Sequence, residues 1–463
     1  MESYRISRVR PVLGPWYDSL VDVTITGGVI SDIQPSRGHA DGDLDCDGAQ
    51  LWPGLWDHHV HFSTHALIQQ AARLSPDATM AGTLDTVRAH LSPDVTHLIG
   101  FGFRSSTWDE IPTAADLDAV TGRPVALMAR DLHSLWCNTA GLGLAGLPGH
   151  PTGFLVEDEA FAAIRHLMAT QTELVDRAVL AAEREAARLG VVGIVDMEMD
   201  WALAAWQRRA GHRRLGLRVV AATYPERFDD LLGLGLPHGH EVAPDVRVGP
   251  LKIIADGSMG SRTAHCVDPY PAPLPHLPHG RSNLDRSQLT ELLVRAHAAG
   301  LHAAVHAIGD AACRDVLDAF EASGCPGSVE HAQCVPPHEL PRFGALGLTA
   351  SIQPAHQIDD AEVIATVWPT AHRYAYPMRS LVSHGARLAL GSDAPVAPLD
   401  PWLAIHAACH QPYRGEEALD LATALRASSH TTLEVGQPAD LVVASAPGAV
   451  VATMVDGRIT HLQ

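Results

Sequence analysis

Eight short apolar segments recur along this chain of 463 residues, and stretches with helical spacing separate several of them. The helical pattern is clear in RSQLTELLVRAHAAG from residue 286 and in AACRDVLDAFEASG from residue 311. Strands that alternate with helices in this way predict an α/β fold built on a (β/α)8 barrel of the TIM type. In such a barrel the catalytic residues lie at the C-terminal ends of the strands. The eight predicted strands lie near residues 51, 191, 217, 251, 302, 328, 349 and 387.

Two parts of the sequence depart from this alternation. VDVTITGGVISDI near the start and ADLVVAS with VATMVDGRIT near the end alternate between apolar and polar residues, as half-buried strands do. We expect residues 1–52 and 430–463 to pair into one small β-sandwich domain and residues 53–429 to form the barrel. More chain lies between the first and second strands than one crossover helix needs, which predicts an insertion at about residues 65–185.

Charge and composition exclude several kinds of partner. The formal net charge of −20 disfavours binding to nucleic acid and to anionic membranes. The sequence has neither an apolar signal segment at its start nor a long uninterrupted apolar stretch, and its 7 cysteines are scattered. We therefore expect a cytoplasmic protein that acts on a small-molecule substrate, and leave open whether it forms a homo-oligomer.

Lys252 is the only lysine in the chain, and every other basic side chain is an arginine. Arginine stays protonated, whereas a shielded lysine can lose its proton and act as a nucleophile. Lys252 lies in the apolar run LKIIAD, which is typical of a buried strand. One use of a neutral amine there is reaction with carbon dioxide, which makes a carbamate able to bridge two metal ions.

His59 and His61 form an HxH pair at the end of the first predicted strand. Alternate residues of a strand face the same side, so both imidazoles can bind one metal. A second pair, His238 and His240, lies in a loop-like segment, so we assign the metal to the first pair.

Three further residues end other predicted strands. His306 follows the fifth strand, His331 the sixth and Asp393 the eighth. Each residue alone is as compatible with a structural role as with metal binding. In a barrel, however, all of them converge on one mouth with Lys252 and the HxH pair.

These residues lie in segments that resemble the amidohydrolase superfamily, and more narrowly the amidohydrolase-3 group of YtcJ-like enzymes, whose relatives include N-substituted formamide deformylases. The resemblance implies a metal-dependent hydrolase acting on carbon–nitrogen bonds other than peptide bonds. It also implies the metal ligands His59, His61, Lys252, His306, His331 and Asp393. The segments that carry it are PGLWDHHVHF, LDAVTGRPVALMARDLHSLWCNTAGL, LKIIADGSMGSRTA, VHAIGDAA, VEHAQ, LGSDAPVAPLDPW and GQPADLVV.

The ligand set predicts a mechanism. His59, His61 and Asp393 would hold one divalent cation, His306 and His331 a second, and carboxylated Lys252 would bridge them. A hydroxide that bridges the cations would attack the substrate carbonyl, and Asp393 would pass the proton to the leaving nitrogen. Zinc suits these ligands best, and manganese or iron would also fit.

Two residues are weaker candidates for substrate contacts. His133 lies in the insertion, and Arg262 lies beyond the turn that follows the Lys252 strand. A solvated loop histidine and an exposed surface arginine explain them equally well or better.

Other functions stay open at this point. A mononuclear zinc deaminase would use the same barrel with Lys252 uncarboxylated, although Gly309 stands where such enzymes generally carry a glutamate. A lyase or isomerase could use the same ligands, because metal ligands do not specify which bond breaks. A metal-free binding protein is disfavoured because every expected ligand is present.

Overall fold

The computed structural model forms two compact units, one made of residues 1–61 and 183–463 and the other of residues 62–182. The structure describes residues 3–39, 42–93, 95–105, 108–130, 134–156, 158–274, 276–361, 364–411 and 413–463.

The larger unit contains the predicted barrel. Its eight strands are parallel, follow one another round the barrel in chain order, and match the eight apolar segments of the sequence. These strands are β6 (Leu55–Val60), β12 (Val191–Asp196), β13 (Arg218–Thr223), β15 (Val246–Ile254), β16 (Ala303–Ala307), β17 (Gly327–His331), β18 (Thr349–Ile352) and β19 (Arg387–Leu390). The predicted (β/α)8 fold is therefore confirmed.

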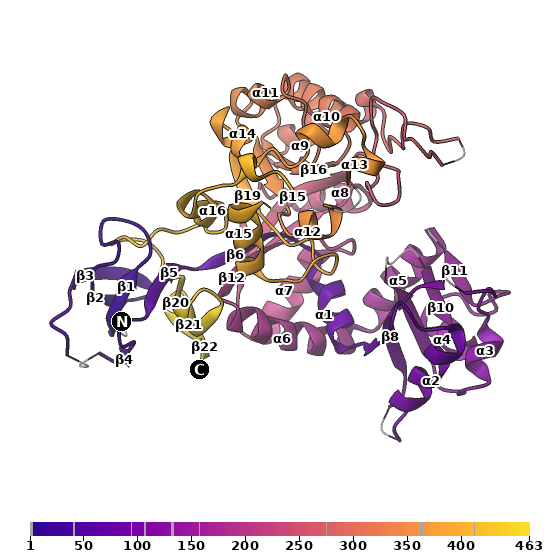
Figure 1. Cartoon of the computed structure of the whole chain (residues 1–463). Coiled ribbons are helices and arrows are strands. Elements are labelled where there is room, and N and C mark those ends of the chain that lie inside the picture. Colours follow the sequence, from indigo (N-terminus) through magenta and orange to yellow (C-terminus); the bar gives the residue numbers. More distant parts are fainter. Residues whose placement is uncertain are drawn as a thin grey trace. The chain divides into compact units, whose positions relative to one another are not determined.

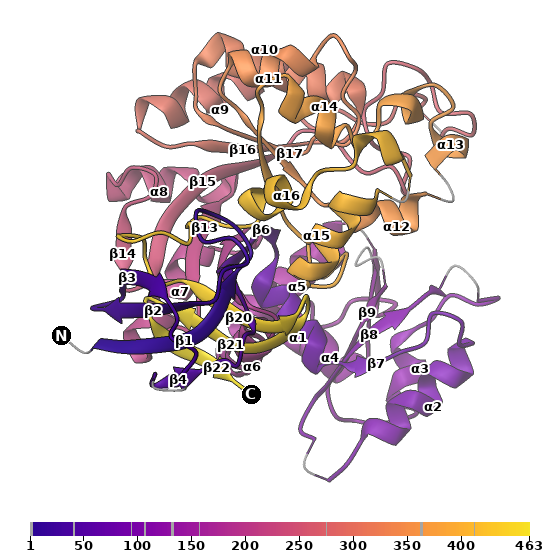
Figure 2. The same ribbon diagram turned by 60° about the vertical axis from the view of Figure 1, so that its left-hand side comes forward.

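Helices follow the barrel strands, as Figures 1 and 2 show. Several begin with a polar cap that satisfies free backbone N–H groups; Asp285, for example, accepts from Gln288 N at 2.8 Å in a reciprocal capping box. The main helices of this unit are α7 (Ala202–His212), α8 (Phe228–Leu234), α9 (Arg286–Ala298), α10 (Asp310–Ser323), α11 (Leu340–Ala345), α14 (Met378–Ser383), α15 (Pro401–His410) and α16 (Leu421–Ala427).

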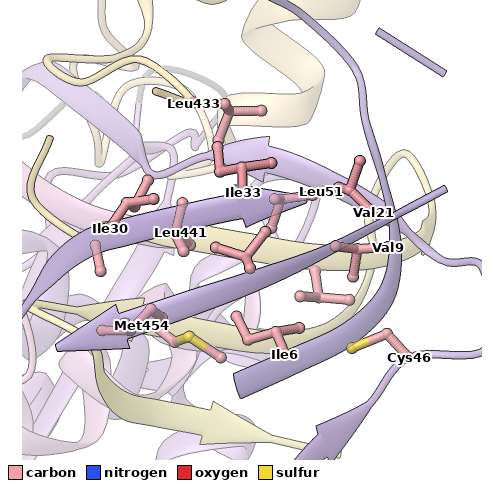
Figure 3. Packing of buried hydrophobic residues seen from close by; sticks show 14 of the residues in the cluster. Ile6, Val9, Val21, Ile30, Ile33, Cys46, Leu51, Leu433, Leu441 and Met454 are labelled. Atoms are coloured by element: carbon pink, nitrogen blue, oxygen red, sulfur yellow. The ribbon is translucent and has the colours of Figure 1, made fainter. Parts of the chain in front are cut away.

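Strands from both ends of the chain pair in one eight-stranded sheet, which we call the β-domain. They lie side by side in Figures 1 and 2, drawn in indigo and yellow. In one continuous sheet β20 (Leu441–Ala446) pairs antiparallel with β5 (Gln50–Pro53), which pairs with β1 (Ser3–Pro11). The two halves of the sheet share one apolar core, shown in Figure 3. The other strands are β2 (Val21–Thr26), β3 (Val29–Pro35), β4 (Leu44–Asp45), β21 (Ala449–Val455) and β22 (Arg458–Leu462).

Arg218, the first residue of β13, connects the barrel to this β-domain. Its guanidinium donates to Asp440 at 2.8 Å and to Asp456 at 2.6 Å. Paired hydrogen bonds from one arginine to carboxylates are geometrically specific, so these contacts fix the β-domain against the barrel.

The smaller unit is the insertion after the first barrel strand. Its five-stranded sheet has the order β11–β10–β9–β8–β7, built from β7 (Ala72–Arg73), β8 (Leu98–Phe103), β9 (Val125–Ala129), β10 (Ser134–Cys137) and β11 (Phe154–Val156). Its helices are α1 (Phe62–Gln70), α2 (Met80–His90), α3 (Ala114–Asp118), α4 (Thr139–Leu144), α5 (Asp158–Thr170) and the first part of α6 (Thr172–Arg188). Trp136, Phe103 and Leu127 lie in its core.

No helix in the described part of the chain combines the length and the hydrophobicity that a bilayer crossing requires.

Candidate metal centre

The first and last barrel strands meet at a seam, which we define as the contact between residues 59–61 and residues 393–394. Asp393 N donates to His59 O at 2.6 Å, and His61 N donates to Ala394 O at 2.9 Å. These backbone bonds place three ligand-type side chains together. His59 Nε2 and His61 Nε2 each lie 3.5 Å from Asp393 Oδ1.

Gly391 and Asp57 make this close approach possible. A Cβ atom on Gly391 would lie 2.6 Å from His59 N, so only glycine fits there. The buried Asp57 carboxylate accepts from Ser392 N at 3.0 Å and from His59 N at 3.1 Å. Burial raises the pKa of Asp57 to about 6.

Lys252 lies inside the barrel, near the C-terminal end of β15, and is 2% exposed. Its Nζ lies 3.4 Å from His59 Nε2. Burial lowers the pKa of Lys252, while the charges of Glu330 and Asp393 oppose that shift. The surroundings therefore favour the neutral amine more than water does.

Glu330 orients His59. The Oε2 atom of Glu330 lies 2.6 Å from Nδ1 of His59, and both side chains are buried. Burial raises the pKa of Glu330, but the hydrogen bond of His59, with further contributions from the nearby basic groups, outweighs it and holds the pKa at about 2. An ionised Glu330 accepts the Nδ1 proton, which leaves the lone pair of His59 Nε2 directed at the centre. Burial and the Lys252 charge also lower the pKa of His59 to about 4, consistent with a neutral imidazole.

His306 and His331 lie on the neighbouring strands β16 and β17, with ring centroids 4.4 Å apart. His306 Nε2 lies 3.1 Å from the carbonyl oxygen of Gly257, to which it donates, so Nδ1 is the nitrogen that this bond does not use. His331 Nδ1 is buried and has no hydrogen-bond partner among the described residues. Burial and the nearby His306 lower the pKa of His331 well below its ordinary value.

Two residues of the centre have strained backbones. His331 and Asp393 have φ angles of 66° and 57°, in the left-handed region that non-glycine residues rarely adopt. Burial raises the pKa of Asp393, but the hydrogen bond of His61 and the nearby imidazoles outweigh it and hold the pKa well below its ordinary range. Asp393 is therefore an ionised carboxylate among histidines, which is the chemistry of a cation site.

The sequence also indicated two weaker candidates, Arg262 and His133. Arg262 is exposed and donates to Ala272 O at 2.8 Å, within its own loop. His133 lies outside the described residues. Burial lowers the pKa of His61, but the hydrogen bond and charge of Asp393 and the charge of the buried Glu198, two residues after β12, outweigh it and raise that pKa.

Sequence reasoning missed two residues of the centre, Glu330 and His356. Glu330 directly precedes His331, and its position two residues after Ser328 on β17 was the available signal, because alternate strand residues share a face. His356 begins α12 (His356–Asp360), a short turn after β18, and its Nε2 lies 3.9 Å from Asp393 Oδ2. Two sets of ligand atoms therefore share Asp393: one with His59 and His61, the other with His331 and His356.

A sequence model described as "Amidohydrolase family" matches residues 44–461. The chain belongs to the amidohydrolase family. Among amidohydrolase relatives it is similar to the putative amidohydrolase YtcJ of Bacillus subtilis, with 27% identity over 79% of this chain and 74% of that protein. It is also similar to the N-substituted formamide deformylase of Arthrobacter pascens, with 26% identity over 91% of this chain and 89% of that protein.

A solved structure from Pyrococcus horikoshii, described as an uncharacterized metal-dependent hydrolase, shares the amidohydrolase fold of this chain. The TM-score is 0.84 at 24% identity, over 99% of this chain and 100% of the other. This similarity shows the fold.

The donor atoms suit the divalent cations that amidohydrolases generally use. Two atoms bound to one zinc ion at about 2.0–2.2 Å lie no more than ~4.4 Å apart. The distances of 3.5 Å from Asp393 Oδ1 to His59 and His61 satisfy that limit. The unpartnered nitrogen of His331 is a second sign of fit, because a buried imidazole nitrogen without a partner costs stability unless a ligand binds it.

Proposed function

We propose that this chain is a hydrolase that uses divalent metal ions to cleave an amide or another carbon–nitrogen bond. Its membership in the amidohydrolase family supports metal-dependent hydrolysis. The observation that carries the proposal is the convergence of His59, His61 and Asp393 beside the buried Lys252. The name of the Arthrobacter relative, an N-substituted formamide deformylase, supports the carbon–nitrogen bond as the target.

In this proposal His59, His61 and Asp393 hold one cation, and His331 and His306 contribute to a second. Zinc suits the imidazole and carboxylate donors best. When bound, the cations would supply an activated water at neutral pH and would polarise the substrate carbonyl.

Lys252 would carry a carbamate that completes both sites. The reaction is addition of the neutral amine to carbon dioxide, which forms one C–N bond and releases one proton to solvent. The lowered pKa of Lys252 supports it, because only the unprotonated amine has the required lone pair. The resulting carboxylate replaces a buried positive charge with a negative one.

Asp393 would serve as the proton carrier. Its Oδ1 faces His59 and His61, and its backbone is fixed by the bond to His59 O. We propose that this carboxylate accepts the proton of the attacking water and passes it to the leaving nitrogen. Glu330 would keep the Nε2 lone pair of His59 directed at the centre throughout.

Lys252 provides the test. Metal content and activity against N-formyl, N-acyl and cyclic amides would be measured on the same samples of wild type, Lys252→Arg and Lys252→Ala. Lys252→Arg keeps the charge but should be inactive, because guanidinium neither reacts with carbon dioxide nor binds a cation. Lys252→Ala should regain part of its metal and turnover with added formate, acetate or propionate.

Each part of the proposed function has a result that would refute it. Near-normal activity of Lys252→Arg would refute the carbamate. A wild-type metal content near one per chain, unchanged by zinc and bicarbonate, would favour the mononuclear deaminase. Turnover of an amide library without net hydrolysis would indicate a lyase or isomerase.

A further inference from the structure

His356 is a second histidine of the barrel mouth with an unpartnered nitrogen. Its Nε2 is buried, and among the described residues it has no hydrogen-bond partner. Leaving a buried polar atom without a partner costs about 1–3 kcal/mol. A residue with such a cost at a candidate metal centre calls for a ligand that the protein itself does not provide.

The surroundings of His356 hold its backbone in place without using Nε2. His356 N donates to Gln353 O at 3.1 Å, and Gln357 Nε2 donates to Pro354 O at 3.2 Å. Asp360, one helical turn further on, accepts from Gln333 and Tyr376 at Oδ2. The Nε2 atom thus stays available.

Asp393 presents its two oxygens to two different sets of imidazoles. Oδ1 lies 3.5 Å from both His59 Nε2 and His61 Nε2, whereas Oδ2 lies 3.9 Å from His356 Nε2. All of these distances are below the ~4.4 Å that separates two ligands of one zinc ion at most. Ligand atoms of His331, His356 and Asp393 lie within 4.8 Å of one another, as do those of His59, His61 and Asp393.

The geometry points to His356 as a direct ligand of the second cation, and to Asp393 as a carboxylate that binds both cations, one through each oxygen. This inference rests on the proposed metal-dependent function and adds a ligand to it. The second site then has donors from His331, His356 and Asp393, with His306 Nδ1 as a fourth, besides the proposed carbamate of Lys252.

The test measures metal binding by the full-length protein. Chelator-treated wild type and His356→Gln are titrated with Zn²⁺, and bound metal is counted by elemental analysis after desalting. Parallel titrations with Co²⁺ follow the visible absorption of each site. Wild type should bind about two ions, and His356→Gln should bind one with little change and the second at least ~100-fold more weakly. Loss of a residue that hydrogen-bonds a metal ligand already lowers metal affinity by about 10–100-fold, so loss of a direct ligand should lower it more.

His372→Gln is the matched control. His372 lies in the following segment, half-buried, with Nδ1 2.7 Å from Trp368 O, which lies outside the metal centre. This variant should bind both ions like wild type. Melting curves of the metal-free proteins check folding, and His356→Gln should melt no lower than wild type because Nε2 has no hydrogen bond to a described residue to lose.

Zinc-loaded wild-type crystals give a measurement that does not depend on any variant. Anomalous diffraction should place His356 Nε2 at about 2.0–2.1 Å from the second ion. Two ions bound by His356→Gln with wild-type affinity, or an ion far from Nε2, would overturn the assignment of His356 alone. A wild-type content near one would overturn the second site, and wild type without metal would overturn the proposed function.

Discussion

Replacing Glu330 with glutamine removes one negative charge from beside His59 while keeping the shape of the side chain. Both partners are 1% exposed, and their 2.6 Å contact joins Oε2 to His59 Nδ1. The amide oxygen of glutamine can still accept the Nδ1 proton. Ser328, which bonds the other carboxylate oxygen, can accept from the new amide group by rotating its hydroxyl. The variant thus isolates the contribution of the charge.

The expected loss follows from that contact. A buried hydrogen bond to a charged group contributes about 1.5–3 kcal/mol, against about 1 kcal/mol for a neutral one. Removing the charge should therefore reduce the free energy of metal binding through His59 by about 1–2 kcal/mol, which raises the metal dissociation constant roughly 5- to 30-fold. This range overlaps the roughly 10- to 100-fold loss of metal affinity that usually follows removal of a residue hydrogen-bonded to a ligand histidine.

The assay is competition between the protein and a chelator for Zn²⁺ at neutral pH, on wild type, Glu330→Gln and Ser328→Ala. Ser328→Ala removes a hydrogen bond to the same carboxylate but keeps the charge, so its metal affinity should change less than about 3-fold. Equal affinities of wild type and Glu330→Gln for the first ion would refute the orienting role of Glu330. Equal losses in the two variants would show that packing, and not charge, matters there.

The remaining predictions concern the barrel and its thiols. Gly391→Ala should lower the unfolding free energy by about 1–3 kcal/mol in denaturant titrations, because the new Cβ meets backbone atoms of His59 at 2.6 Å, whereas Gly211→Ala in α7 meets nothing within 4 Å and should be neutral or stabilising. His238 packs on His302 at 3.9 Å between centroids, and burial with that neighbour lowers its pKa to about 4. The unfolded state therefore binds more protons between pH 6.5 and 4, and stability falls as the pH drops through that window. His238→Phe should reduce this loss by about 1–2 kcal/mol at pH 5, and an unchanged pH profile would contradict it. All 7 cysteines are free, so thiol titration should count seven in unreduced, denatured protein and, in native protein, fast reaction at Cys409 alone, the cysteine that is not fully buried.

The sequence predicted the barrel well because its strands have a local signature. Each strand buries an apolar run such as LKII or LRVV, and the helices between them have their own period. The convergence of His59, His61, Lys252 and Asp393 followed from topology alone, since barrel strands end at one mouth.

Glu330 and His356 were not predicted, for physical reasons. Regular alternation lets either Glu330 or His331 face the barrel interior, but the left-handed φ of His331 turns both toward the centre. His356 reaches the centre through the turn at Pro354. Its position in the sequence does not distinguish it from an ordinary loop histidine. The donation of His306 Nε2 to Gly257 O, which leaves Nδ1 as the nitrogen that could bind a metal, is a tertiary contact without a sequence signal.

The seam also determines when during synthesis the centre can exist. His59 and His61 leave the ribosome early, but Asp393 follows the last barrel strand, so a growing chain holds an incomplete donor set until the barrel can close. In the described residues β6 and β19 share no continuous ladder, and an isolated bridge joins Val60 to Ala394, four residues after β19 ends. Metal that binds only the closed barrel would stabilise that junction by about 4 kcal/mol at a thousandfold excess over Kd. In the proposed function, metal loading would therefore depend on the finished chain, because a chain truncated before Asp393 would lack one of the donors and the stability that bound metal would add.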